Sequence, residues 1–191
     1  MRSQLRLAVF LVVIVLGCWE CGSFRWPTTP SNLSGSESTP TPTPTPTPIP
    51  KPVVKVSSIS VADVILETNS QRKTNGLSSL AENSKLNEAA DFKMRDMFAR
   101  QYFDHYGPDQ TSGVAELLAR FNYPYMMAGE NLALGNFKNA SELVALWMAS
   151  PGHRANILNS IYRDIGVGIG YDVFKGRRTI IAVQIFGTPA R

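Results

Sequence analysis

The chain has 191 residues, of which 43% are apolar and 18% are charged, and its formal net charge is +4. This composition excludes a wholly disordered chain and a membrane protein with many spans, and the lack of a dense Lys/Arg stripe argues against nucleic acid as a partner. Nine of the 13 prolines lie between Pro27 and Pro52, so the folded part follows them, and its 191 − 52 = 139 residues suffice for one domain.

The N-terminus is predicted to be an export signal. Two arginines precede Leu7–Leu16, a run of ten apolar residues, whereas a membrane-spanning helix needs about 20. The segment Val15–Cys18 (VLGC) then resembles a bacterial lipobox, which ends at the cysteine that receives lipid. We therefore expect a signal peptide of lipoprotein type at residues 1–17 and lipid attachment at Cys18. The alternatives are ordinary signal cleavage and an uncleaved anchor helix that runs to about Trp26.

Residues 18–58 are predicted to be a Thr/Pro-rich tether without a unique conformation. Five Thr-Pro pairs occupy residues 39–48, and such alternation favours polyproline II, which extends roughly 3.1 Å per residue. We expect the tether to hold the domain away from the membrane and to be trimmed by proteases up to a core beginning near Val56. The only cysteines, Cys18 and Cys21, precede the domain, so the domain has no internal disulfide.

Apolar periodicity predicts several helices in the first part of the domain. The expected helices cover about residues 60–73, 84–101, 114–121 and 139–149. In the second of these, the apolar stripe includes Met94 and Met97, while Lys93 is expected on the face turned to water. In the last, the apolar face is expected to include Leu146 and Trp147.

A period of two predicts strands near the C-terminus. Three glycines alternate with apolar residues in Ile165–Val173, and a strand face so bare of side chains indicates that another element packs directly against it. A turn at Lys175–Arg177 leads to the returning strand, Thr179–Phe186. Helices followed by an antiparallel hairpin indicate an α+β fold in which the helices cover the sheet.

Three polar positions are candidates for chemistry. His105 and His153 are the only histidines and are expected in loops, and Glu130 is expected to begin an extended segment. Two imidazoles and one carboxylate suit a zinc site with an open fourth position, or a histidine pair polarised by glutamate for acid–base work. Histidines that only hydrogen-bond within the fold are the third interpretation. No G-x-S-x-G motif is present, which argues against a serine hydrolase.

The order and spacing of these positions resemble the CAP superfamily, also called SCP-like extracellular domains, which includes cysteine-rich secretory proteins, antigen 5 and plant pathogenesis-related proteins. The resemblance covers about residues 60–187 and is greatest to the short bacterial branch, which lacks the disulfides of the eukaryotic members. The matching motifs are Asn69-x-x-Arg72, Tyr102-Phe103-x-His105, Gly129-Glu130-Asn131-Leu132-Ala133, Ser150-Pro151-Gly152-His153-Arg154-x-Asn156 and Ile165-Gly166-Val167-Gly168.

This resemblance implies an α-β-α sandwich over residues 59–188, with helices on both sides of a mainly antiparallel sheet. It also implies a cleft in which two histidines and two glutamates meet. His105, Glu130 and His153 match three of these four residues, and Ser150 stands near the place of the second glutamate. We expect the three matching side chains to gather, as ligands of zinc or as candidate catalytic groups.

The predicted protein is exported, and it is either anchored to the outer face of the cell membrane or secreted. We expect a monomeric binding module whose partner is an envelope polymer, a lipid or a protein. The family that it resembles shares no single reaction, and the sequence contains no complete catalytic set. The alternative is an envelope hydrolase, protease-like or acting on peptidoglycan, that uses zinc-bound water or the His/Glu set.

Overall fold

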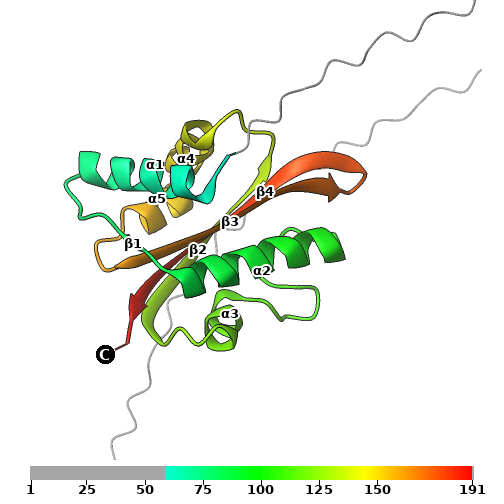
Figure 1. The fold of residues 1–191 in the computed structure, drawn as a ribbon, viewed down its shortest axis with the longest axis horizontal. Coiled ribbons are helices and arrows are strands. Elements are labelled where there is room, and N and C mark those ends of the chain that lie inside the picture. Colours follow the sequence, from blue (N-terminus) through cyan, green and yellow to red (C-terminus); the bar gives the residue numbers. More distant parts are fainter. Residues whose placement is uncertain (1–58, 191) are drawn as a thin grey trace, which may run out of the picture. The chain divides into compact units, whose positions relative to one another are not determined.

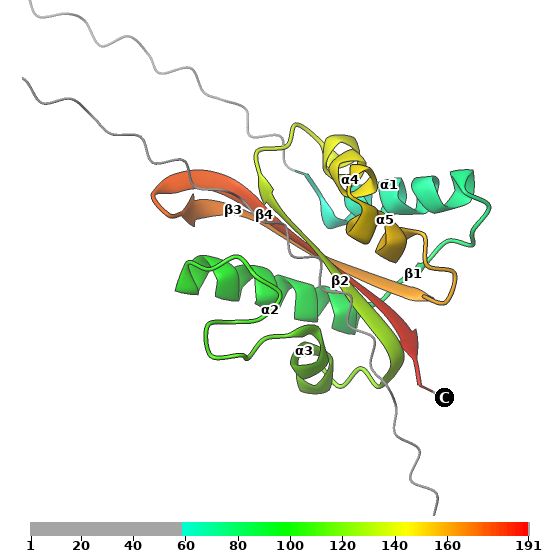
Figure 2. The same ribbon diagram turned by 180° about the vertical axis from the view of Figure 1, so that it is seen from behind.

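A four-stranded sheet lies between two layers of helices in the computed structural model, which describes residues 59–190 (Figure 1). One layer contains α1 (Val61–Thr74), α4 (Ala140–Ala149) and α5 (Pro151–Ile157). The other contains α2 (Ser84–Arg100) and α3 (Val114–Arg120), as the view from behind also shows (Figure 2). The predicted α+β class and α-β-α sandwich are confirmed, while the signal segment and the tether lie outside the described residues.

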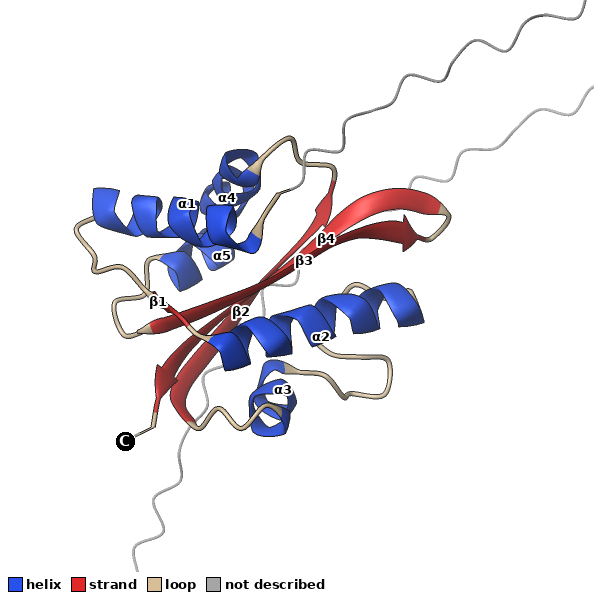
Figure 3. Cartoon of the chain, viewed as in Figure 1, coloured by secondary structure: helices blue, strands red, loops and turns tan. Residues whose placement is uncertain are grey.

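The sheet has the strand order β1-β3-β4-β2, and its strands lie between the two helical layers (Figure 3). Its strands are β1 (Ala81–Glu82), β2 (Tyr125–Gly135), β3 (Asp164–Phe174) and β4 (Arg177–Pro189). Only the short pairing of β1 with β3 is parallel, so the sheet is mainly antiparallel, as expected. The hairpin of β3 and β4 turns at Lys175 and Gly176, whose φ angles of 47° and 80° suit a two-residue turn.

Strand β4 is buried on both faces, because each helical layer covers one of them. Its side chains alternate between the faces: Ile181 and Val183 belong to the core under α2 and α3, and Ile180 and Ala182 to the core under α1, α4 and α5. Two apolar cores, one on each side of the sheet, therefore hold the three layers together.

Helix α2 packs directly on the glycine-lined face of β3, as the alternation of glycines predicted. A Cβ atom at Gly168 would lie 2.5 Å from the backbone nitrogen of Asp91. A Cβ at Gly166 would meet the backbone of Leu86 and Asn87 in the same way. The glycines thus allow the helix backbone to touch the strand, which no larger residue permits.

Side-chain caps explain where three helices begin. The side-chain oxygens of Ser60, Asn83 and Asn139 accept hydrogen bonds from backbone N–H groups in the first turns of α1, α2 and α4. The Glu142 carboxylate accepts a hydrogen bond from the backbone N–H of Lys138. The bounds of α1 to α4 agree with the predicted ones within one or two residues, whereas helix α5 had no predicted counterpart. Among residues 59–190, no helix has the length and apolar character needed to span a membrane.

The structure corrects four expectations. His153 lies within helix α5 and not in a loop, and Glu130 lies in the middle of β2 and not at the start of an extended segment. Lys93 is fully buried, whereas Leu146, expected in the core, is 49% exposed. Strand β1 was not expected at all.

Candidate functional site

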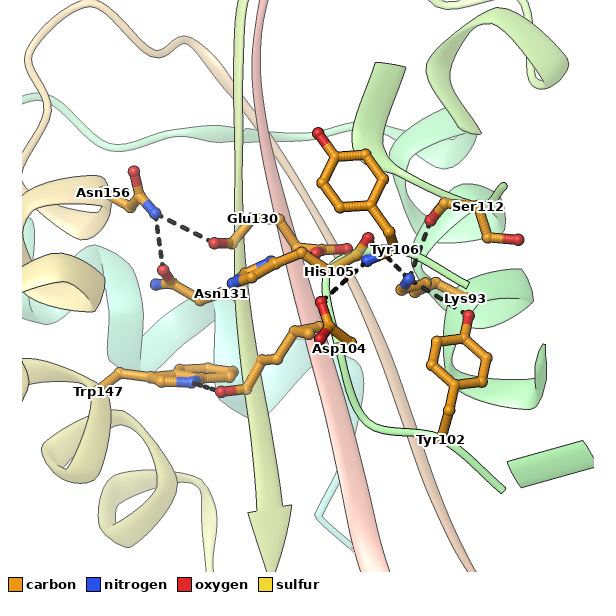
Figure 4. Close-up of polar contacts among 11 residues, drawn as sticks. Lys93, Tyr102, Asp104, His105, Tyr106, Ser112, Glu130, Asn131, Trp147 and Asn156 are labelled. Atoms are coloured by element: carbon orange, nitrogen blue, oxygen red, sulfur yellow. Dashed lines mark hydrogen bonds and ion pairs between the residues drawn. The ribbon is translucent and has the colours of Figure 1, made fainter. Parts of the chain in front are cut away.

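The three candidate residues come from three parts of the fold that meet along strand β2. His105 lies in the loop of residues 101–113, which joins α2 to α3 on one side of the sheet. Glu130 lies in β2, which forms one edge of the sheet, and His153 lies in α5 on the other side. Figure 4 shows the His105 loop and strand β2 side by side. Neither helical layer alone could form this site.

His105 and Glu130 form a hydrogen-bonded pair. His105 Nδ1 lies 2.7 Å from Glu130 Oε1, and the Glu130 side chain is 4% exposed while that of His105 is 54% exposed. An ionised carboxylate only accepts hydrogen bonds, so Nδ1 carries the proton and donates it. The bond to Glu130 raises the pKa of His105, and this effect outweighs the opposing effect of burial. The structure thus places two of the three predicted site residues, His105 and Glu130, in direct contact.

His153 has the opposite electrostatic environment. Burial lowers the pKa of His153, and the charge of nearby His105 lowers it further. His153 Nδ1 is buried without a hydrogen-bond partner, and so is the second carboxylate oxygen of the pair, Glu130 Oε2. Buried polar atoms without partners are rare in folded proteins and mark places where water or a ligand completes the bonding.

A buried network of amide side chains joins His153 to the strand that bears Glu130. Asn131 Nδ2 donates to the carbonyl oxygen of His153 at 3.2 Å and to Gln184 Oε1 at 3.1 Å. Asn156 Nδ2 donates to the Glu130 carbonyl at 3.1 Å and to Asn131 Oδ1 at 2.9 Å. Figure 4 shows the Asn156 bonds from α5 to β2. The network fixes α5 against the edge strand. Gln184, a member of this network, was not predicted as a site residue, because no sequence motif marks it.

The network and Trp147 also occupy the free edge of β2. Trp147 Nε1 donates to the Leu132 carbonyl at 3.1 Å, as Asn156 does to the Glu130 carbonyl. Backbone carbonyls on an edge strand otherwise lack partners within the sheet. Helices α4 and α5 therefore supply the hydrogen bonds that a further strand would have made.

The three residues predicted as zinc ligands are not arranged as a ligand set. In the part of the chain that the structure describes, no group of three or more His, Cys, Asp or Glu side chains is placed to hold a metal ion. One Glu130 oxygen is bonded to His105, while the other, like His153 Nδ1, is buried without a hydrogen-bond partner. The donor atoms fit a hydrogen-bonded pair better than a three-ligand centre, and zinc binding stays a prediction of the sequence.

Comparison with known proteins identifies the domain. A sequence model of the Cysteine-rich secretory protein family, CAP, matches residues 66–186 and so includes His105, Glu130 and His153. The chain belongs to the CAP family.

Two relatives are bacterial proteins, each longer than the region that matches this chain. The chain is 40% identical over 114 residues to the protein YkwD of Bacillus subtilis, and 31% identical over 115 residues to the membrane protein YlbC of that species. These matches cover 59% and 60% of this chain, but only 44% and 33% of the two relatives.

Solved structures share the CAP fold. An extracellular SCP-domain protein of Bacillus anthracis superposes with a TM-score of 0.57 at 27% identity, covering 66% of this chain and 39% of that one. An outer surface protein of Borrelia burgdorferi also gives a TM-score of 0.57, at 20% identity, covering 66% of this chain and 90% of that one. The second likeness, at this low identity, concerns the fold alone.

His105 leaves one ring nitrogen available for hydrogen bonds with a ligand. With Nδ1 of His105 bonded to Glu130, the other ring nitrogen, Nε2, is the atom left to contact a ligand. Nε2 donates a hydrogen bond when the ring is protonated and accepts one when it is neutral. The bond to Glu130 raises the pKa of His105 and so favours the protonated ring. Ser150, which stands near the place of the family's second glutamate, lies at the junction of α4 and α5 and is half-buried.

The variant Glu130→Gln is expected to lower the pKa of His105, because it removes the negative charge that favours the imidazolium. The raised pKa means that the pair stabilises the fold below the unfolded pKa of about 6.5 and that this contribution is lost as pH rises through the folded pKa. Glu130→Gln should therefore lose more stability at pH 5 than at pH 8. NMR titration and urea unfolding at both pH values measure these effects.

His153→Gln provides the opposite case. Because its pKa is lowered, His153 stabilises the fold above about pH 6.5, and that contribution is lost as pH falls through the folded value. The stability of this variant relative to the parent should therefore improve toward low pH. The same direction of change in both variants would contradict the opposed environments of the two residues.

Proposed function

We propose that this protein is an exported CAP-domain binding module, attached to the outer face of the membrane by a lipid on Cys18. Its ligand contacts His105, Glu130 and His153. The observation that carries the proposal is the buried Glu130 carboxylate, bonded to His105 on one oxygen and without a partner on the other. A preformed polar group of this kind, beside a half-exposed imidazole, suits a ligand rich in hydroxyl or amide groups.

The relatives support the location. The solved Bacillus anthracis relative is an extracellular protein, and YlbC is a membrane protein. An envelope polymer such as peptidoglycan carries both sugar hydroxyls and peptide amides, and it lies next to a domain tethered outside the membrane. We therefore take peptidoglycan as the first ligand to test.

Hydrolysis is the second candidate function, and the His105–Glu130 pair favours it. A histidine oriented by a carboxylate is the arrangement that general acid–base catalysis uses. In that function His105 Nε2 exchanges a proton with the substrate or with water, and Glu130 stabilises the imidazolium through Nδ1.

One experiment separates the two functions. The full chain, purified in detergent, is incubated with insoluble peptidoglycan, with and without added zinc; protein in the pellet and fragments in the supernatant are both measured. We expect sedimentation of the parent chain, and its loss in Glu130→Gln and His105→Ala. The control is Arg95→Gln, which changes an exposed residue of α2 outside the site. Soluble fragments that depend on His105 would favour the hydrolase, and sedimentation unchanged in both site variants would contradict the proposed site.

Lipid attachment is tested by Cys18→Ser. If Cys18 is acylated, this variant loses its anchor and moves from the membrane fraction to the soluble extracellular fraction, because the apolar run before it is too short to span a bilayer. Cys21→Ser is the matched control and should remain with the membrane. Retention of Cys18→Ser in the membrane fraction would instead support an uncleaved helical anchor.

A further inference from the structure

Lys93 is a buried cation next to the site, and the function proposed above does not use it. It lies on the face of α2 that packs against the rest of the domain, and its side chain is 0% exposed. Lysine is almost never fully buried unless its charge is compensated. A fully buried ammonium therefore needs a specific set of partners.

The partners of Lys93 match its donors in number. Its Nζ lies 2.9 Å from the His105 carbonyl oxygen, 3.0 Å from the Ser112 carbonyl oxygen and 3.3 Å from the Tyr102 hydroxyl. The Tyr102 hydroxyl donates to Asp96 at 2.6 Å, so its oxygen is free to accept from Lys93. An ammonium has three donors, and all three are used.

These bonds attach both limbs of the 101–113 loop to one point on α2. His105 lies on the limb that leaves α2, and Ser112 lies on the limb that leads to α3. Between them, Gly107 N donates to the Thr111 carbonyl at 2.6 Å and closes the tip of the loop. The loop is thereby fixed at its base by Lys93 and at its tip by its own backbone.

His105 is consequently held at two places. Lys93 holds its backbone carbonyl, and Glu130 holds its ring at Nδ1 (Figure 4). The charges around Lys93 are consistent with this arrangement: burial lowers the pKa of its ammonium, while Glu130, Asp96 and Asp104 raise it. A buried cation and a buried carboxylate thus flank the half-exposed histidine from either side.

We propose that Lys93 is the positioning residue of the site, because its ammonium fixes the 101–113 loop so that the His105 ring meets Glu130. Lys93 does not itself contact the ligand. The inference depends on the proposed function only for its consequence, since the position of His105 affects binding only if His105 contacts the ligand.

The test compares Lys93→Met with Lys85→Met in the full chain purified in detergent. Methionine keeps the length and the apolar part of lysine but removes all three donors. Lys85 lies on the same helix, but its side chain donates one exposed hydrogen bond, to the Asn122 carbonyl. The chain has two histidines, so with ¹⁵N-labelled histidine and His153→Gln as the assignment variant, the ring signals of His105 are identified directly.

We expect the parent and Lys85→Met to show a His105 Nδ1 proton protected by its bond to Glu130. In Lys93→Met this signal is lost, while the His153 ring signals are retained. A general loss of stability would not produce this result, because the signals come from the folded molecules. Folded Lys93→Met with an unchanged His105 signal would overturn the proposal.

If Lys93→Met does not fold, hydrogen exchange of the parent protein decides. A loop fastened by Lys93 should open only together with α2, so the Gly107 amide should exchange no faster than the Met94 amide. Exchange of Gly107 through an opening that leaves α2 protected would overturn the proposal. None of these measurements uses a ligand, so failure to bind peptidoglycan with an intact His105 signal counts against the proposed function alone.

Discussion

Replacing Gly168 by alanine is expected to destabilise the domain by about 3 kcal/mol or more, at the upper end of the cost of overpacking a core. The added Cβ would meet the backbone of Ala90 and Asp91 in α2, and a helix backbone cannot rotate away as a side chain can. Either α2 must move off β3 or the strand must bend. Urea unfolding of the purified variant measures the loss directly.

Gly170→Ala is the matched control in the same strand. Its added Cβ would lie 2.5 Å from Met94 Sδ, in a flexible side chain that can adopt another rotamer. We expect a cost of only about 1 kcal/mol. Equal losses at the two positions would mean that backbone contact between α2 and β3 is not what excludes side chains from Gly168.

Arg72→Met is expected to cost about 3 kcal/mol or more, because it leaves three carbonyl oxygens without a donor and each loss costs about 1–3 kcal/mol. The Arg72 guanidinium is 1% exposed and donates to the carbonyls of Ser78, Ile157 and Asn159 at 2.9, 2.7 and 2.8 Å. The bonds to Ile157 and Asn159 join α1 to the end of α5, and the bond to Ser78 holds the segment between α1 and β1. Methionine preserves most of the apolar contact, so unfolding of this variant measures chiefly the lost hydrogen bonds.

The chain contains a close control for Arg72. Arg163 also donates to three carbonyl oxygens, those of Ser160, Ile161 and Tyr162, but it is exposed to solvent. Water can replace its bonds, so Arg163→Met should change stability by no more than about 0.5 kcal/mol. A comparable loss in both arginine variants would show that burial is not what makes Arg72 important.

Repeating patterns in the sequence predicted much of the fold. The glycines of β3 could be interpreted because a bare strand face has one physical explanation, close packing, and the structure shows α2 at that place. The helix bounds followed from apolar periodicity and capping residues. Family resemblance, and not spacing, predicted that His105 and Glu130 would meet, since their contact depends on how the loop after α2 reaches the edge strand.

The prediction for Lys93 was wrong because its charge indicated exposure, whereas its position in the helix indicated burial. Lys93 follows Leu86 by seven residues, which places it on the buried stripe of α2, but its charge led to the opposite assignment. The position was the better guide, because the loop supplies the partners that its ammonium needs. The segment around His153, expected as a loop, is a helix, and Pro151, a frequent first residue of helices, is the sequence signal for it.

The position of β4 in the sheet has a consequence for the order of folding. The central strand, Arg177–Pro189, is the last element of the described chain, and it lies between β3 and β2. Both apolar cores contain side chains of β4, so neither core can be completed by the earlier helices and strands alone. We therefore expect the domain to fold only after β4 has been synthesised, because its pairings with β3 and β2 and its two buried faces complete both cores.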